Sequence, residues 1–197
     1  VKRILSALTN IDGAKWRNPY RYFTKEDQKR ADASLNLYDQ WHLFIHDRPS
    51  QTIADIRAQI LKTKREYPGI PYLVIIDYLQ LISHSGKFER HDLAIGKITK
   101  ELKQIARGQN VPILLLSQLS RGVEQRQDKR PVMSDLRDSG SIEQDADLIM
   151  LLYRDEYYDR KSKDKNTIEI NLAKHRNGPT GTIKFGFQKE FSRFIER

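Results

Sequence analysis

Two polar side chains, Asp77 and Gln118, follow apolar runs that have the length of a buried strand. Asp77 comes directly after Tyr72–Ile76, and Gln118 comes two residues after Val111–Leu116. In open α/β sheets, ligands bind beyond the carboxyl ends of parallel strands. A carboxylate there can hold Mg²⁺, and a Gln amide can contact a terminal phosphate. The pair therefore indicates a nucleotide site; the alternative is two strands that simply end at polar turn residues.

The segment Arg121–Ser141, which follows Gln118 closely, is polar, charged and rich in cations. Binding of single-stranded DNA needs cations and free backbone N–H groups that face phosphates. Gly140 and its serine neighbours permit a close approach of the backbone to an anion. The segment has no aromatic residue, so contact with the DNA backbone is favoured over base stacking, and a charged surface loop is the alternative. The candidate DNA-binding cations are Arg126, Lys129, Arg130 and Arg137.

A third group of candidate residues lies at the end of the predicted strand Thr167–Ala173, where Lys174 and Arg176 flank His175. Alternate residues of an extended chain point the same way, so the two cations can reach one target together. Such a pair can engage a phosphate, including one that is bound by a neighbouring subunit. The alternative is the basic rim of a hairpin.

The composition narrows the class of protein. The chain of 197 residues carries 35 Lys and Arg against 26 Asp and Glu, which gives a net charge of +9. This excess favours an anionic partner, with nucleic acid as the first candidate and a solvated basic surface as the alternative. Cysteine is absent, which excludes disulfides, Cys-zinc sites and Cys nucleophiles and fits a reducing compartment. No apolar run approaches the ~18 residues of a membrane span, and the length predicts one domain over residues 1–197.

Helical and strand patterns alternate along the first three quarters of the chain, and a run of strands follows. This order predicts an α/β fold: a mostly parallel sheet flanked by helices, with antiparallel strands at the C-terminal end. The nearly continuous apolar run Tyr72–Asp77 is typical of a strand covered on both faces. The expected helices are Val1–Ile11, Thr24–Asn36, Thr52–Tyr67 and His91–Arg107. The expected strands are His42–Asp47, Tyr72–Asp77, Val111–Leu116, Leu148–Tyr153, Thr167–Ala173, Gly181–Phe187 and Ser192–Ile195.

The sequence lacks part of what ATP hydrolysis requires. No Gly-x-x-x-x-Gly-Lys-Ser/Thr phosphate loop occurs in the 197 residues, and Tyr78 rather than Glu follows Asp77. Nothing in these residues can wrap the β- and γ-phosphates of a nucleotide. We therefore expect this chain by itself to be inactive as an ATPase.

Several joined motifs resemble the replicative hexameric DNA helicases of the DnaB family. The resemblance is dense from about residue 72 to the end and looser, though in register, before it. The motifs that carry it are Ile76–Leu81, Leu116–Arg121, Glu124–Arg126, Asp128–Pro131, Asp135–Arg137, Ser139–Asp147 and Lys174–Pro179.

The resemblance implies the RecA-like motor domain at the C-terminal end of such helicases. In that family the residue matching Asp77 is the metal carboxylate, and the one matching Gln118 couples the terminal phosphate to the DNA-binding loops. The residues matching Lys174 and Arg176 reach the γ-phosphate in the adjacent subunit. We take all four as catalytic and ATP-binding candidates, with Asp77 as the Mg²⁺ ligand.

The resemblance also implies how DNA is bound. The residues matching Arg137, Asp138 and Gly140 contact the backbone of single-stranded DNA in the central channel of a homo-hexamer. Asp138 departs from the pattern, since many members carry Glu, but a contact made through backbone groups survives that change.

The parent protein implied by the resemblance is an ATP-dependent helicase of DNA replication that uses ATP and Mg²⁺. Its partners would be single-stranded DNA, a primase and a helicase loader, in the cytoplasm of a bacterium or a phage-infected cell and away from membranes. The family's phosphate loop and catalytic Glu lie before the position of Val1, so we expect an N-terminally truncated chain. The alternatives are a non-catalytic RecA-like DNA-binding module and a recombinase-type ATPase of the same superfamily.

Overall fold

The computed structural model describes residues 1–83, 91–136 and 139–196. The chain divides into two compact units, each made of segments that are distant in the sequence. Unit 1 consists of Val1–His46, Leu152–Asn171 and Thr182–Arg197, and unit 2 consists of Asp47–Leu151 and Leu172–Gly181. Along the sequence, segments of unit 1 alternate with segments of unit 2. The single domain over residues 1–197 stays a prediction.

The core of unit 2 is built on two parallel strands, β1 (Val74–Ile76) and β2 (Ile113–Leu115). Val74 pairs with Ile113 and Ile76 with Leu115, so the two carboxyl ends lie at the same edge of the sheet. This parallel pairing confirms the prediction from the two apolar runs. It places the residues after Ile76 beside those after Leu115.

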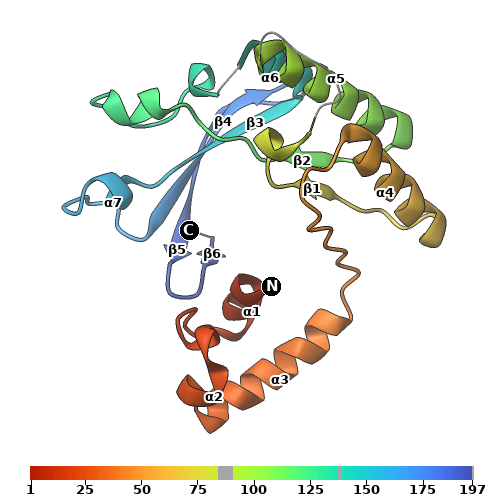
Figure 1. The fold of residues 1–197 in the computed structure, drawn as a ribbon. Coiled ribbons are helices and arrows are strands. Elements are labelled where there is room, and N and C mark those ends of the chain that lie inside the picture. Colours follow the sequence, from red (N-terminus) through yellow and green to blue (C-terminus); the bar gives the residue numbers. More distant parts are fainter. Residues whose placement is uncertain (84–90, 137–138, 197) are drawn as a thin grey trace. The chain divides into compact units, whose positions relative to one another are not determined.

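Two amphipathic helices, α4 (Ile53–Glu66) and α5 (His91–Gln109), lie side by side along this sheet (Figure 1). Helical spacing brings Ile56 and Ile60 of α4 and Ile98 and Leu102 of α5 into one buried cluster. Burial of each such side chain contributes about 1.5–3 kcal/mol to the stability of the fold. The helices thereby hold the sheet whose edge carries the candidate site.

The opposite face of the β1–β2 sheet is exposed in the described structure. Successive side chains of a strand point to opposite faces, and α4 and α5 cover only one of them. Leu73, Ile75, Leu114 and Leu116 are exposed as a result. The prediction that the strand Tyr72–Asp77 is covered on both faces is therefore wrong for the described residues, because an apolar run reports which residues can be buried and not what packs on them.

The second sheet has the strand order β3-β4-β5-β6. Its last two strands pair in antiparallel fashion, with Gly186 opposite Ile195, which confirms the predicted antiparallel strands at the C-terminal end. The strands are β3 (Leu148–Tyr153), β4 (Thr167–His175), β5 (Gly181–Gln188) and β6 (Arg193–Ile195).

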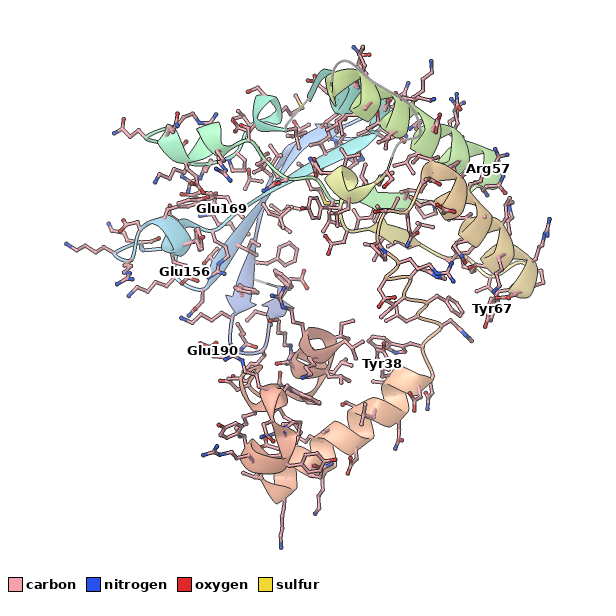
Figure 2. The ribbon with its side chains drawn as sticks, in the orientation of Figure 1. Tyr38, Arg57, Tyr67, Glu156, Glu169 and Glu190 are labelled. Atoms are coloured by element: carbon pink, nitrogen blue, oxygen red, sulfur yellow. The ribbon has the colours of Figure 1, made fainter. Side chains whose placement is uncertain are left out.

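Unit 1 contains the helices α1 (Lys2–Thr9), α2 (Pro19–Tyr22) and α3 (Lys25–Asp39). The start of α3 is fixed by a capping box: Asp27 N donates to Thr24 Oγ1 and Thr24 N donates to Asp27 Oδ2. Figure 2 shows Tyr38 in the last turn of α3 and Glu190 between β5 and β6; the Glu190 carbonyl accepts a hydrogen bond of 2.8 Å from Gly13 N.

The predicted strand His42–Asp47 is wrong, because the described chain is not in a strand there. Leu43, Phe44 and Ile45 are all exposed. A short apolar run becomes a strand only where a neighbouring strand pairs with its backbone, and the sequence pattern does not report that pairing.

The remaining elements are short. In the described ranges no helix has both the length and the apolar character that crossing a bilayer requires. The short elements are α6 (Ser139–Asp145), α7 (Asp155–Tyr158) and the 3-10 helices Lys15–Arg17, Leu79–Leu81, Arg121–Gln125 and Met133–Asp135.

Candidate nucleotide and nucleic-acid site

Asp77 lies at the carboxyl end of β1, where the backbone is fixed from both sides. Leu116 N donates to Ile76 O at 3.0 Å, and Leu79 N donates to Leu116 O at 2.8 Å. The peptide bond that follows Asp77 is cis. The Asp77 side chain is exposed and makes no hydrogen bond or ion pair with another described residue. A carboxylate that hydrogen-bonds to no described residue therefore stands on a fixed backbone at the edge where parallel sheets bind ligands.

Gln118 follows β2 at the same edge of the sheet, and the side chain of Gln80 holds its backbone there. Gln80 Nε2 donates to Ser117 Oγ, and Gln118 N donates to Gln80 Oε1, both at 3.3 Å. The Gln118 side chain itself is exposed. Sequence reasoning missed Gln80; the available signal was a polar residue between Leu79 and Leu81.

The edge fits a magnesium ion that is held mainly by water and phosphate oxygens. Within the described ranges no group of three or more His, Cys, Asp or Glu side chains could form a metal cage. Mg²⁺ needs no such cage, since it commonly binds one or two carboxylates and completes its shell with water and substrate phosphates. Asp77 has the chemistry to supply one such carboxylate.

The chain after Gln118 forms a closed loop. Leu119 forms an antiparallel bridge with Leu136, and Ser120 N donates to Asp135 O at 2.7 Å. The loop of residues 120–135 thus leaves and returns beside Gln118. Leu136 directly precedes Arg137 in the sequence, so the bridge connects the Gln118 backbone to the start of the predicted DNA contact.

Arg126 cross-links this loop from inside. Its Nη1 and Nη2 atoms donate to the two oxygens of Asp135 at 3.1 and 2.6 Å, and Nη2 also donates to Arg130 O at 2.9 Å. Asp135 is 6% exposed and accepts a further bond from Val132 N. Two parallel bonds from a guanidinium to a carboxylate are a strong, directional arrangement. Arg126 therefore holds the loop in shape, and any contact with DNA would share its guanidinium with Asp135.

The other candidate DNA contacts are placed as follows. Arg130 is exposed, with Nη1 3.6 Å from Asp128 Oδ1, and Lys129 is half-buried. Gly140 is exposed in α6, and a Cβ added there would meet open space. The predicted contacts Arg137 and Asp138 lie outside the described residues.

Lys174, at the end of β4, is bound to the last turn of α6. Its Nζ donates to Glu143 O at 2.5 Å and to Ala146 O at 2.7 Å. The last carbonyls of a helix have no partner within the helix, so an ammonium group satisfies them well. Lys174 thereby ties the end of β4 to α6.

Arg176 is bound to Asp147, the residue that follows Ala146 in the sequence. Arg176 N donates to Asp147 O at 2.8 Å, and Arg176 Nη1 donates to Asp147 Oδ1 at 3.3 Å. Lys103 Nζ of α5 donates to the other carboxylate oxygen. Hydrogen bonds from Lys103 and then from Arg176 hold the pKa of Asp147 below its usual value. Neither Asp147 nor Lys103 was singled out from the sequence.

The turn after β4 is closely packed. His175 Nδ1 lies 3.1 Å from Pro179 O, and the His175 ring covers Gly178 so closely that a Cβ there would overlap the ring. Glycine is therefore required at residue 178 by the close approach. The turn that carries Arg176 is fixed on both sides of that residue.

Comparison with known proteins decides the family. The model of the DnaB-like helicase C terminal domain matches residues 1–196. The chain belongs to this family. The DnaB resemblance seen in the motifs is thus confirmed.

Relatives of this DnaB-like chain agree with that assignment. It is 46% identical over 196 residues to the replicative DNA helicase DnaC of Bacillus subtilis (strain 168) and, equally, to the replicative DNA helicase DnaB of Geobacillus stearothermophilus. Each match covers 99% of this chain and 42% of the relative. The chain therefore spans less than half the length of these curated relatives.

Solved structures give the same result for the fold. A DnaB-like replicative helicase, described with its interactions with primase, superposes with a TM-score of 0.96 at 41% identity and covers 100% of this chain and 47% of that one. A second solved structure, described as an ATPase domain, gives the same TM-score and identity, with 69% of that chain covered. The predicted RecA-like α/β fold is confirmed.

Within this DnaB-like fold, the predicted site residues form two groups. Asp77 and Gln118 follow β1 and β2 at the same edge of the sheet, and the closed loop that contains Arg126, Lys129 and Arg130 begins after Gln118. Lys174 and Arg176 are bound to the segment at the end of α6. No hydrogen bond between described residues joins the two groups.

Proposed function

We propose that this chain is the motor region of a replicative DNA helicase that hydrolyses ATP with Mg²⁺ between the subunits of a homo-hexamer. The ring translocates on single-stranded DNA and unwinds the duplex. One observation carries the proposal: the exposed Asp77 and Gln118 follow the carboxyl ends of two paired parallel strands, at one edge of the sheet, in a chain that matches the DnaB-like family over residues 1–196.

Each residue at this edge has a distinct task. Asp77 holds the magnesium ion, which when bound neutralises charge on the phosphate oxygens. Gln118 contacts the terminal phosphate with its exposed side-chain amide, while its backbone stays fixed by Gln80. A shift at Gln118 passes directly to the Leu119–Leu136 bridge, and so to the chain that leads into the DNA contact.

The basic segment is the path of the DNA backbone. We assign contacts with phosphates to Lys129, Arg130 and Arg137 and to the backbone at Asp138 and Gly140, with Arg126 holding the loop in shape and contributing its remaining donors. These contacts neutralise phosphate charge and carry no base sequence information, so binding depends strongly on salt and little on sequence.

Lys174 and Arg176 act on the ATP of the adjacent subunit. A guanidinium placed there stabilises the charge that develops on the γ-phosphate in the transition state. A primase and a helicase loader are the expected protein partners, and primase is supported by the solved relative that is described with it. We place the protein in the cytoplasm of a bacterium or of a phage-infected cell.

The direct test is the variant Asp77→Asn in the full-length protein that contains this chain. Loss of a metal carboxylate removes several kcal/mol of transition-state stabilisation, so DNA-stimulated phosphate release should fall by about 10²-fold or more. Asp39→Asn makes the same charge change at an exposed position in α3 and should leave the rate unchanged.

Two outcomes would contradict the proposal. Normal phosphate release by Asp77→Asn would remove Asp77 from the metal site. A full-length wild-type protein that binds single-stranded DNA without hydrolysing ATP would favour the non-catalytic RecA-like module instead.

A further inference from the structure

Asp147 lies between two cations and belongs to none of the predicted site groups. Its two carboxylate oxygens accept hydrogen bonds from Lys103 and Arg176, and its carbonyl accepts one from the Arg176 backbone. We propose that Asp147 is a positioning residue that presents Arg176 to the nucleotide of the adjacent subunit. This inference rests on the proposed function of Arg176.

The geometry leaves Arg176 able to bind a phosphate while Asp147 holds it. A guanidinium carries five N–H donors in a planar fork, and the carboxylate takes only Nη1. The Arg176 side chain is 65% exposed, and no other hydrogen bond from it reaches a described residue. Several donors therefore remain for an anion that arrives from outside.

Asp147 is itself held in place by α5 and α6. Lys103 of α5 fixes one carboxylate oxygen, and Thr99 Oγ1 of α5 donates to Asp145 at the end of α6 at 2.6 Å. The two helices lie against each other (Figure 1), so closely that a Cβ on Gly96 would lie 2.6 Å from Ser141 Oγ. The carboxylate thus stands on a rigid base.

A positioning role explains this arrangement better than a stabilising role does. Asp147 is 57% exposed, and ion pairs between exposed side chains contribute little to the free energy of unfolding. An Arg side chain that moves freely loses rotamer entropy when it binds a phosphate, and this cost would add to the activation free energy of hydrolysis. A carboxylate that orders Arg176 beforehand removes this cost from the reaction step, because a correctly oriented group reacts faster.

The same segment also holds the second cation. Lys174 is bound to the carbonyls of Glu143 and Ala146, directly before Asp147. Residues 143–147 therefore fix both Lys174 and Arg176, and they do so from the end of the helix that contains Gly140. Displacement of this segment would move both cations together.

The test measures ATP hydrolysis of Asp147→Asn in the full-length protein with single-stranded DNA. Misplacement of a catalytic group by about 1 Å can cost as much as 10²-fold in rate, so we expect kcat to fall by about 10-fold or more. KM for ATP should change less than about twofold, since a transition-state interaction affects mainly kcat. Asp147→Glu keeps the carboxylate and should recover part of the rate.

Controls separate this role from a structural one. Glu66→Gln removes an exposed carboxylate of α4 that pairs with Lys62 and should leave kcat unchanged. Lys103→Met should lower kcat in the same direction as Asp147→Asn. The thermal midpoint of Asp147→Asn should match that of the wild type.

The decisive comparison is with Arg176→Ala. If Asp147 acts only through Arg176, adding Asp147→Asn to Arg176→Ala should lower the single-turnover rate no further. Normal hydrolysis by Arg176→Ala would overturn the proposed function of Arg176. If Arg176→Ala is slow, two results would overturn the role of Asp147 alone. The first is normal hydrolysis by Asp147→Asn, and the second is a double variant that loses as much further rate as Asp147→Asn loses by itself.

Discussion

The two groups of candidate residues differ in what is held fixed. At the β1–β2 edge, the backbones of Asp77 and Gln118 are fixed, while their side chains are exposed and hydrogen-bond to no described residue. At the end of β4, the side chains of Lys174 and Arg176 are themselves bound, to the end of α6 and to Asp147. The first group is open to a ligand, and the second is ordered before any ligand arrives.

This difference matches the two tasks we propose. A nucleotide bound in the same subunit can order nearby side chains with its own binding energy. A cation that acts across an interface meets its phosphate only when two subunits are aligned, so any remaining freedom of the side chain slows the reaction. Order in advance is therefore most valuable for Lys174 and Arg176.

The largest expected effect comes from Arg176→Ala in the full-length protein. Loss of an arginine that stabilises a transferring phosphoryl group costs about 10³–10⁵ in rate, far more than loss of a surface arginine. Arg57→Ala, which removes the exposed arginine of α4 labelled in Figure 2, should hydrolyse ATP normally. Equal rates for the two variants, measured by phosphate release, would make Arg176 a rim charge.

A smaller effect is expected where the partner of a held cation is removed and the loss falls on the stability of the loop. Asp135→Ala removes two of the three hydrogen bonds that the Arg126 guanidinium makes with described residues and the acceptor of Val132 N, so the free energy of unfolding should fall by about 1–3 kcal/mol. Asp128→Ala removes an exposed carboxylate from the same loop and should change stability by less than about 0.5 kcal/mol. Denaturant titration of both variants measures the difference; similar midpoints would show that the Arg126–Asp135 contact does not hold the loop.

An effect on stability alone, seen most clearly in its pH dependence, is expected in unit 1. Asp27, only 2% exposed, is bound by Lys15 and Arg30, and the hydrogen bond from Lys15 is the main reason that its pKa lies far below the usual range. A carboxylate whose folded-state pKa is depressed stabilises the fold above its unfolded-state pKa of about 4, and this contribution is lost as pH falls below that value.

Asp27→Asn should therefore lower the thermal midpoint at neutral pH and flatten its decline between about pH 5 and pH 2. ATP hydrolysis at neutral pH should stay near the wild-type rate, in contrast to Asp147→Asn. A variant with the same acid dependence as the wild type would show that the ion pairs of Asp27 do not contribute to stability.

Local sequence patterns predicted most elements of the fold. The spacing of Ile56 and Ile60 predicted α4, the Thr24–Asp27 box predicted the start of α3, and the run before Asp77 predicted β1. Such signals need only neighbouring residues. The predicted strand His42–Asp47 failed because strand formation depends on a pairing partner elsewhere in the chain.

The site was predicted only in part, for the same reason. Asp77, Gln118, Lys174 and Arg176 stand at strand ends, which a pattern can locate. Their supporting contacts join residues that are distant in sequence: Gln80 lies 38 residues from Gln118, and Lys103 lies 44 residues from Asp147. No local pattern reports these contacts, so they emerged only from the fold.

The most direct test of the central claim mixes two inactive full-length proteins. Arg176→Ala subunits keep a working nucleotide edge, and Asp77→Asn subunits keep a working Arg176. If Arg176 acts on the nucleotide of the adjacent subunit, mixed rings contain interfaces with both parts intact, and ATP hydrolysis should rise above that of either variant alone. Mixed rings that form, as shown by mass or by differently tagged subunits, and yet stay inactive would contradict action across the interface.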